Sequence, residues 1–419
     1  MKFNKWTVGL AAVGAVSLAS VVRAEEKASS VMTAVSSTTL SGYVDTSMNW
    51  NVGDGNARVA NYAFNTTGKQ DGFNLNVVDI KISKALDESE WAAGYMVDIF
   101  NGPDATALGT GTIFKQAYVN LRTPVGNGLD WKIGVFDNII GYESTESPNN
   151  PNFSRSYGYT LEPTTLTGIL ASYKFSELIS ASIGIADTLN AAVGGSGAAG
   201  SRANPPYAET SKTYVGSVAL TAPNNWGFIS GSSLYIGLEN GEFNEGVPAG
   251  IVPAGFVPTT ATFFYAGATI NTPVTGLKAG ISYDHAKYRP GPGTAITANW
   301  ADSVALYASY QATEKLSIHG RGEYFWEKSD FGPISGPNEV LAFTGTLQYD
   351  LWKNVLSRLE FRWDHQAGDN TLASTVGTGA TIGSGWYGGS PNGAGGVVPG
   401  ATAGRHDSFT LVANAVYKF

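Results

Sequence analysis

The final twelve residues, Ser408–Phe419, alternate between two kinds of side chain. Every second residue from Phe409 onward is apolar, and the residues between them are mostly polar or small. A period of two predicts a β-strand whose two faces meet different surroundings. The length also suits a tilted strand that crosses a bilayer, which takes roughly 9–11 residues. We therefore expect this segment to close a transmembrane barrel, with Tyr417 and Phe419 marking its assembly strand. The alternative is an amphipathic strand of a secreted β-sandwich.

About sixteen such alternating segments run between Leu40 and Phe419. Each is individually weak, as is usual for barrel strands, so their number and spacing carry the prediction. The first begins at Leu40, and the others begin near Phe73, Trp91, Phe114, Leu129, Gly168, Ile179, Thr213, Ser233, Phe263, Leu277, Ser303, Leu316, Val340, Val355 and Ser408.

The links between these segments alternate between short and long. The short links are rich in Gly, Pro, Asn and Asp: Leu86–Glu90, Thr123–Gly128, Ser176–Leu178, Thr272–Gly276, Thr313–Lys315 and Leu351–Asn354. The long links are Val52–Gly72, Asp137–Thr167, Thr188–Lys212, Gly241–Thr262, Ala286–Ala301 and Gln366–Asp407. Short periplasmic turns and long external loops are typical of outer-membrane barrels. The fold class that we predict is all-β: a transmembrane antiparallel β-barrel of about 16 strands, an even number because both ends lie on the short-turn side.

Charged side chains occupy only one face of the clearest strands. In Leu316–Trp326 and Ser357–His365 the apolar residues alternate with charged or polar ones, and the apolar faces end in aromatics such as Trp50, Trp91 and Trp363. A bilayer requires every backbone group to be paired, which a closed barrel provides. We therefore place the apolar faces against lipid and predict that the following residues face the lumen: Asp45, His319, Arg321, Glu323, Arg358, Glu360, Arg362 and Asp364.

Composition agrees with a barrel and excludes several other classes. Charged residues make up 14% of the chain, below the roughly 25% of an average soluble domain. The hydrophobic fraction is an ordinary 43%, which argues against a bundle of membrane helices. Cys is absent, so the chain has no disulfide and no thiolate site. The formal net charge is −8 and no basic helix stands out, so we expect no nucleic-acid partner.

The beginning of the chain resembles a secretory signal. Met1–Lys5 supplies positive charge, Trp6–Val22 is apolar with many small residues, and Ala24 follows as the residue before the expected cut. A retained anchor helix is the alternative, although such a helix needs roughly 20 consecutive apolar residues. We therefore divide the chain into a signal peptide (1–24), a short N-terminal segment (25–38) and a transmembrane barrel domain (39–419).

The long link Asp137–Thr167 is the best candidate for a pore constriction. Barrels of 16–18 strands leave an aqueous channel, and long loops inside compact domains are commonly functional. Acidic and basic side chains that face one another across a channel would select solutes by charge and size. The alternative is a solvated cap over the rim. The candidate constriction residues are Glu143, Glu146, Arg155, Tyr157 and Glu162, with Tyr159 beside them.

Three short motifs give the chain a family resemblance. They are the run Asn152–Ser156 followed by Pro163 and Gly168, the run Gly42–Asp45, and the strand start Ser357–Phe361. Together they resemble the OmpL-like family of outer-membrane β-barrel porins, over essentially the mature chain. The resemblance implies a diffusion porin, with outer-membrane lipid around it and small hydrophilic solutes passing through it. It supplies no catalytic residues, and a homotrimer is expected only by analogy with other large porins.

Enzymatic and cofactor-dependent functions are poorly supported. The chain has only four His residues, and His319, beside Arg321 and Glu323, is the best candidate for proton transfer. The Gly-rich stretch 377–383 lacks the dinucleotide spacing, so we expect no cofactor. Three functions remain open: a porin, which we favour; a structural or adhesive barrel whose loops Gly241–Thr262 and Gln366–Asp407 bind a partner; and a secreted soluble β protein.

Overall fold

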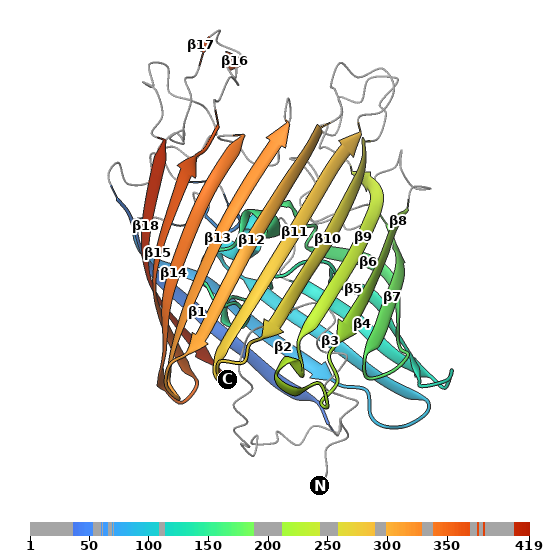
Figure 1. Ribbon diagram of the computed structural model, residues 1–419. Coiled ribbons are helices and arrows are strands. Elements are labelled where there is room, and N and C mark those ends of the chain that lie inside the picture. Colours follow the sequence, from blue (N-terminus) through green and yellow to red (C-terminus); the bar gives the residue numbers. More distant parts are fainter. Residues whose placement is uncertain are drawn as a thin grey trace.

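The protein forms a closed antiparallel β-barrel in the computed structural model (Figure 1). The structure describes residues 37–52, 60, 62–65, 69, 71–108, 114–187, 212–243, 259–289, 299–328, 338–368, 375–376, 380–381 and 406–419. Within these ranges no helix is long and apolar enough to span a membrane. The expected signal peptide, its cut after Ala24 and most of the segment 25–38 lie outside the described residues.

Sixteen strands make the barrel, and each pairs with its neighbours along the chain. The first eight are β1 (Thr39–Asn51), β2 (Gly72–Lys84), β3 (Ala92–Asn101), β4 (Phe114–Thr123), β5 (Leu129–Asp137), β6 (Thr165–Lys174), β7 (Ile179–Ala186) and β8 (Thr213–Thr221). The other eight are β9 (Ser233–Phe243), β10 (Thr259–Asn271), β11 (Leu277–Arg289), β12 (Asn299–Gln311), β13 (Leu316–Lys328), β14 (Glu339–Trp352), β15 (Val355–Gln366) and β18 (Asp407–Lys418). The predicted fold class and strand number are confirmed.

The barrel closes where β18 pairs with β1 on one side and β15 on the other. Beyond the ladder, the backbone N–H groups of Gly42 and Phe419 each donate a hydrogen bond of 3.0 Å to the carbonyl of the other residue. A side chain at position 42 would collide with the carbonyl of Asp79 on β2, which explains the glycine. The closed ladder leaves no edge strand, as a bilayer demands.

Exposure alternates along the strands as the two-face pattern predicts. On β15, Leu359 is 57% exposed and Phe361 is 40% exposed, whereas Glu360 and Arg362 between them are each 1% exposed. Trp50 and Trp91 are exposed on the apolar side, at 57% and 71%. The outer surface is therefore apolar with aromatics near the strand ends, and the charged side chains turn inward.

The strand ends that the short links join lie at one end of the barrel, and the strand ends that the long links join lie at the other (Figure 1). Several strands extend farther toward the long-loop end than the sequence predicts: β10 begins at Thr259 rather than Phe263, and β12 at Asn299 rather than Ser303. Register pairs continue there although the apolar alternation has stopped, because hydrogen bonding between strands does not require a lipid-facing side chain.

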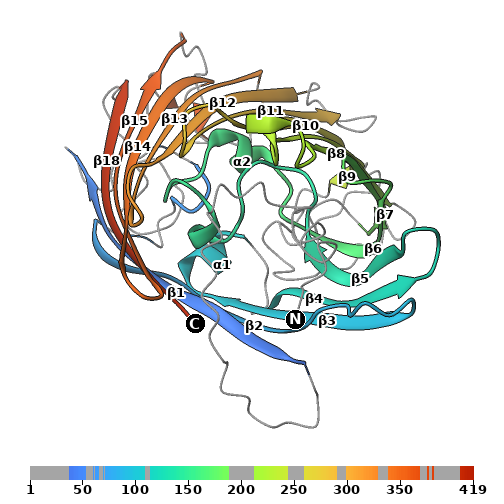
Figure 2. The same ribbon diagram turned by 60° about the horizontal axis from the view of Figure 1, so that its bottom comes forward.

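Small elements within the links were not predicted. The link β3–β4 carries α1 (Pro103–Ala107), and the link β5–β6 carries η2 (Ser147–Asn149) and α2 (Tyr157–Leu161). A further short helix, η3 (Gly227–Ile229), lies in the link β8–β9, and the pair β16 (Thr375–Val376) and β17 (Ala380–Thr381) lies in the link β15–β18. Figure 2 shows α1 and α2 enclosed by the ring of strands. Both helices are one turn long, too short for a periodic pattern to appear in sequence.

Candidate functional site

The link between β5 and β6 lies inside the barrel and reaches wall strands far from its own. We call residues 138–164 the inner loop. Near its start, Ile139 accepts a hydrogen bond through its carbonyl from the hydroxyl of Tyr235 on β9. Farther on, Asn152 donates to Thr346 on β14, 194 residues away, at 2.7 Å. The inner loop is therefore held against the barrel interior by side chains of the wall.

Inward-facing glycines make room for the first part of the inner loop. A Cβ at Gly237 would collide with Ile140, and a Cβ at Gly280 on β11 would collide with the hydroxyl of Tyr142. The Tyr142 ring stacks on Tyr307 of β12 with 4.2 Å between ring centroids. Burial raises the pKa of Tyr142 to about 12, so the phenol stays neutral. The two glycines thus leave space in the wall for the side chains of Ile140 and Tyr142.

Arg321 on β13 is the main polar anchor of the inner loop. Its guanidinium is 0% exposed and donates to Glu143 at 2.8 Å, to Glu323 at 3.0 Å and to the carbonyl of Ser154 at 2.7 Å. Glu323 in turn accepts the backbone N–H of Tyr157 at 2.7 Å. These charge-assisted hydrogen bonds bind two separate parts of the loop to one wall strand.

Strand β15 supplies a second row of anchors with alternating charge. Glu360 accepts the backbone N–H groups of Phe153 at 2.6 Å and Ser154 at 2.9 Å. Arg358 donates to the carbonyls of Ser147 and Asn150, each at 2.9 Å. Arg362 donates to the carbonyl of Arg155 at 2.7 Å. The charged side chains of β15 therefore form hydrogen bonds with backbone N–H and C=O groups of the inner loop. Without these bonds the backbone groups would be left unpaired inside the barrel.

Glu146 of the inner loop contacts wall strands close to β5, the strand from which the loop emerges. Glu146 forms ion pairs with Lys81 on β2 and with Lys115 on β4, the latter at 3.6 Å. Burial raises the pKa of Glu146, but Lys115 and Lys81 outweigh that effect, so the pKa lies below its usual value. Lys115 also pairs with Asp98 on β3 at 3.3 Å. The inner loop emerges from β5 and is anchored on β13, on the other side of the sixteen-strand ring, so it spans the width of the lumen.

Arg155 and Tyr157 shape the loop itself. Arg155 donates to the carbonyls of Ser144 at 2.9 Å and Thr145 at 2.8 Å, which folds the loop back on itself. The hydroxyl of Tyr157 donates to Asp364 on β15 at 2.9 Å. The α2 helix begins after Ser156, whose hydroxyl accepts the backbone N–H of Tyr159 at 3.0 Å and caps the helix.

Glu162, near the end of the inner loop, lies beside another acid. Burial raises the pKa of Glu162 well above its usual value, and the nearby carboxyl of Asp284 on β11 raises it further. Side chains at Gly141 and Gly158 would collide with Glu162 and Asp284 respectively, so two glycines accommodate this carboxyl pair. The two acids can lie together only if a proton is retained between them.

Two other links pack onto the inner loop. Phe64 from the β1–β2 link, Ala105 and Leu108 from the β3–β4 link, and Tyr159 form part of one buried apolar cluster. The Tyr62 ring lies 3.8 Å from the guanidinium carbon of Arg362. The inner loop is thus covered by a layer of aromatic and aliphatic side chains on the side of the long loops.

The predicted lumen residues all lie on the inward face, but their surroundings differ from the expectation. Arg321 is 0% exposed and Glu360 and Arg362 are each 1% exposed, because the inner loop covers them. Asp45, Glu323, Arg358 and Asp364 are likewise buried. We expected these charges to meet water. Most of them instead pair with the loop, because an irregular backbone inside a barrel needs hydrogen-bond partners. Asp45 accepts hydrogen bonds from two residues of the wall, Asn76 and Asn414.

Sequence reasoning missed several residues of the barrel wall around the inner loop. Lys81, Lys115, Asp98 and Asp284 were not singled out, and Tyr62 was assigned to a long external link. Lys81 follows Asp79 and precedes Ser83 at a spacing of two, so its inward position could have been found. Lys115 could not, because the register shifts between Asp98 and Ile99 and breaks the alternation.

The candidate proton-transfer residue His319 faces inward, with Nδ1 2.8 Å from the hydroxyl of Ser309. His285 and His365 lie on the outward face and contact Asp302 and Asp407, each at 2.8 Å. Among the described residues, no group of three or more His, Asp or Glu side chains is arranged to hold a metal ion. Most of the Gly-rich stretch 377–383 and most of the two loops considered for adhesion lie outside the described residues.

A protein-family comparison matches most of the chain. The family model described as "Putative beta-barrel porin-2, OmpL-like" matches residues 37–387. A comparison with curated proteins gave no match.

Several solved outer-membrane proteins have a similar fold. The anion-selective porin from Comamonas acidovorans aligns with a TM-score of 0.57 at 14% identity, covering 91% of this chain and 99% of that one. The outer membrane channel DcaP of Acinetobacter baumannii aligns with a TM-score of 0.54 at 11% identity, covering 91% and 97%. OmpT of Vibrio cholerae aligns with a TM-score of 0.52 at 10% identity, also covering 91% and 97%. At these identities the likeness establishes the fold alone.

Proposed function

The chain belongs to the OmpL-like beta-barrel porin-2 family. From this membership we propose that it forms a water-filled channel in the bacterial outer membrane, through which small hydrophilic solutes and ions diffuse passively. The short-turn end of the barrel then lies in the periplasm and the long-loop end outside the cell, the orientation that short turns and long loops have in such barrels. Outer-membrane lipid surrounds the apolar face.

The observation that carries the proposal is the inner loop inside a sixteen-strand barrel. A barrel of this size has a lumen wider than its own side chains can fill. Here a loop anchored on β13, β15 and β2 occupies part of that lumen and narrows it. A structural barrel would have no need of a lumen, and an open pore would pass larger solutes than a narrowed one. The arrangement favours a size-limited channel.

The inner loop also determines the charge near the constriction. Glu143 and Glu146, two of the acids predicted to line it, form ion pairs with Arg321 and with Lys81 and Lys115. Their charges are therefore largely compensated, and the field that they add across the channel is small. We propose that size dominates over charge in the selection of solutes at the loop.

Planar bilayers and liposome swelling test the proposal. The mature protein, purified in detergent, should insert with discrete conductance steps, and liposomes that contain it should swell in pentoses and hexoses faster than in trisaccharides. The control is the same preparation unfolded in denaturant. Insertion without conductance, together with no swelling in any sugar, would reject the channel and favour a structural or adhesive barrel.

A further inference from the structure

The outward face of β11, β12 and β13 carries basic side chains at the long-loop end. These three strands are neighbours in the barrel (Figure 1). The register pairs Lys287 of β11 with Trp300 of β12, and pairs Trp300 with Lys328 of β13. The residues next to them in sequence, Ala286 and Ala301, face inward and are 0% exposed. Two lysines therefore flank one tryptophan on the outer surface, with backbones about 10 Å apart, which is twice the spacing between strands.

A third cation continues this face. Arg289 follows Lys287 at a spacing of two and is exposed. We call Lys287, Arg289 and Lys328 the basic patch. None of the three forms a hydrogen bond or an ion pair with any residue that the structure describes. The link 290–298, between β11 and β12, contains no charged residue. Neighbouring cations without a partner repel one another and attract an anion.

Two acids on the same face are bonded to other side chains. Asp302 of β12 accepts a hydrogen bond from the hydroxyl of Tyr283 at 2.7 Å and lies 2.8 Å from Nδ1 of His285. Glu339 of β14 accepts a hydrogen bond from the hydroxyl of Tyr324 at 3.0 Å. Neither acid forms an ion pair with the basic patch, so the patch keeps its positive charge.

The basic patch borders the lipid-facing surface of the barrel. On β13, the rings of Trp326 and Tyr324 follow Lys328 toward the short-turn end and lie 5.4 Å apart. Farther in the same direction, Leu306 of β12 is 58% exposed. Aromatic girdles mark the boundary between the hydrocarbon and the headgroups. Cations just beyond such a girdle lie at the level of the lipid headgroups.

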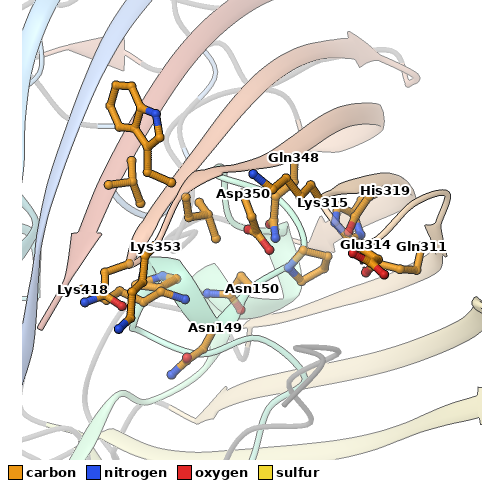
Figure 3. Close-up of a pocket in the computed structure, with 17 residues that line it drawn as sticks. Asn149, Asn150, Gln311, Glu314, Lys315, His319, Gln348, Asp350, Lys353 and Lys418 are labelled. Atoms are coloured by element: carbon orange, nitrogen blue, oxygen red, sulfur yellow. Dashed lines mark hydrogen bonds between the residues drawn. The ribbon is translucent and has the colours of Figure 1, made fainter. Parts of the chain in front are cut away.

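Basic residues at the other end of the barrel are arranged differently. Lys315, Lys353 and Lys418 line an inner cavity between the short turns and the inner loop, together with the acids Glu314 and Asp350 (Figure 3). These three lysines share an enclosed space with acids, so they do not form an outward cationic surface like the basic patch.

We propose that the basic patch binds the phosphate group of an outer-leaflet lipid. The two lysines and Arg289 donate charge-assisted hydrogen bonds to the phosphate oxygens. The acyl chains lie along the apolar outer face of β12 and β13, and this second surface selects a lipid over free phosphate. The site rests on the proposed orientation in the outer membrane, with the long loops outside, but it does not require the barrel to conduct.

Dioleoylphosphatidic acid is the probe, with two matched controls. Dioleoylglycerol has the same acyl chains without the phosphate, and glycerol 3-phosphate has the phosphate without the chains. The mature protein is refolded into detergent, so that no membrane lipid is carried over, and binding is measured by native mass spectrometry. Phosphatidic acid should bind in a saturable manner, and each control should bind at least tenfold more weakly.

Substitutions that remove charge locate the site. Lys287→Gln and Lys328→Gln should each weaken the binding of phosphatidic acid about fivefold, the effect of one basic residue near an anionic lipid surface. The double variant should bind more than tenfold more weakly. Lys287→Arg keeps the charge and should bind as the wild type does. Lys212→Gln should do so as well, because Lys212 lies at the same end of the barrel but pairs with Asp187.

The outcomes separate this inference from the channel function. Binding of phosphatidic acid that the double variant weakens supports the site, whether or not the protein conducts. A conducting channel whose double variant binds phosphatidic acid as tightly as the wild type overturns the site and leaves the channel standing. Equal binding of phosphatidic acid and either control also overturns it. The change of gel mobility on boiling verifies that each variant has formed a closed barrel.

Discussion

Arg321 on β13 and Glu143 in the inner loop are 178 residues apart in sequence, and their side chains meet at 2.8 Å with neither exposed to more than 5%. The same guanidinium donates to Glu323 and to the carbonyls of Ser154 and Arg155. One residue of the wall therefore holds both the outgoing and the returning parts of the loop. A buried charge with this many partners stabilises one position of the loop strongly, because each partner would be left unpaired by its removal.

Substitution of Arg321 should therefore destabilise the protein far more than substitution of its partner. Arg321→Met leaves buried carboxylates unpaired and should lower the free energy of unfolding by about 3–5 kcal/mol. Glu143→Gln keeps an acceptor for Arg321 and should cost about 1 kcal/mol. Arg122→Met, which breaks the partly exposed pair with Asp130 away from the loop, is the control and should cost less than about 1 kcal/mol. Urea unfolding in lipid vesicles measures all three, and equal effects of Arg321→Met and Arg122→Met would refute the anchoring role.

The space that Gly280 leaves for Tyr142 can be tested by adding a side chain at position 280. In Gly280→Val the new side chain occupies the position of the Tyr142 hydroxyl, so the inner loop should shift and the protein should lose about 1–3 kcal/mol of stability. Gly320→Val on β13 is the matched control, because a Cβ there meets nothing within 4 Å. Limited proteolysis should cut the inner loop faster in Gly280→Val only. If the inner loop resists proteolysis equally in both variants, Gly280 does not make the space that Tyr142 needs.

The carboxyl pair of Glu162 and Asp284 predicts a pH dependence with a definite sign. The pKa of Glu162 is raised in the folded protein, so the folded state holds a proton that the unfolded state has released once the pH exceeds about 4.3. The stability contributed by this group is complete below that pH and declines as the pH rises toward the folded-state pKa. Stability measured between pH 4 and pH 8 should fall less steeply in Glu162→Gln than in the wild type. Glu177→Gln, on an exposed turn, is the control and should keep the wild-type dependence of stability on pH. If Glu162→Gln also keeps it, no proton is retained between Glu162 and Asp284.

The orientation of the barrel in lipid can be tested with single cysteines, since the chain has none of its own. Leu347 is 48% exposed on the outward face of β14, and Gln348, the next residue, lines the inner cavity. In lipid vesicles a small charged thiol reagent should label Gln348→Cys and spare Leu347→Cys. Glu360→Cys should be spared as well, because the inner loop covers that position. Labelling of Leu347→Cys in preference to Gln348→Cys would show that the lipid-facing and lumen-facing sides are assigned the wrong way round.

Most of the barrel could be predicted from the sequence because lipid and lumen impose opposite chemistry on neighbouring residues. On β13 and β15 this contrast is uninterrupted, and every inward charge there except Glu327, which lies beyond the predicted end of β13, was identified. On β2 and β4 the pattern is broken by register shifts, so that Asn76 and Val77, and likewise Lys115 and Gln116, are buried as consecutive residues. A bulge inserts a residue that no period of two anticipates.

The inner loop could be located from its length and charge, but its contacts could not be predicted. Glu143 and Arg155 were both identified as charged, yet one pairs with β13 and the other folds back onto the carbonyls of Ser144 and Thr145. Acceptors of this kind are backbone groups, which have no sequence signature. The sequence therefore specifies which charges are present, and only the folded loop determines which of them face open solvent.

The central claim is that the inner loop narrows a water-filled channel, and the single-channel conductance of a loop-shortened variant tests it most directly. Residues 144–155 would be replaced by Gly-Ser-Gly, a change that keeps Tyr142 and α2 and exposes the charged faces of β13 and β15 to the lumen. The variant and the wild type would be measured in the same bilayers at the same salt concentration. We expect discrete steps for both proteins, with steps at least twofold larger for the shortened loop. Steps of equal size, or a wild type that inserts without conducting while the variant conducts no better, would contradict the account.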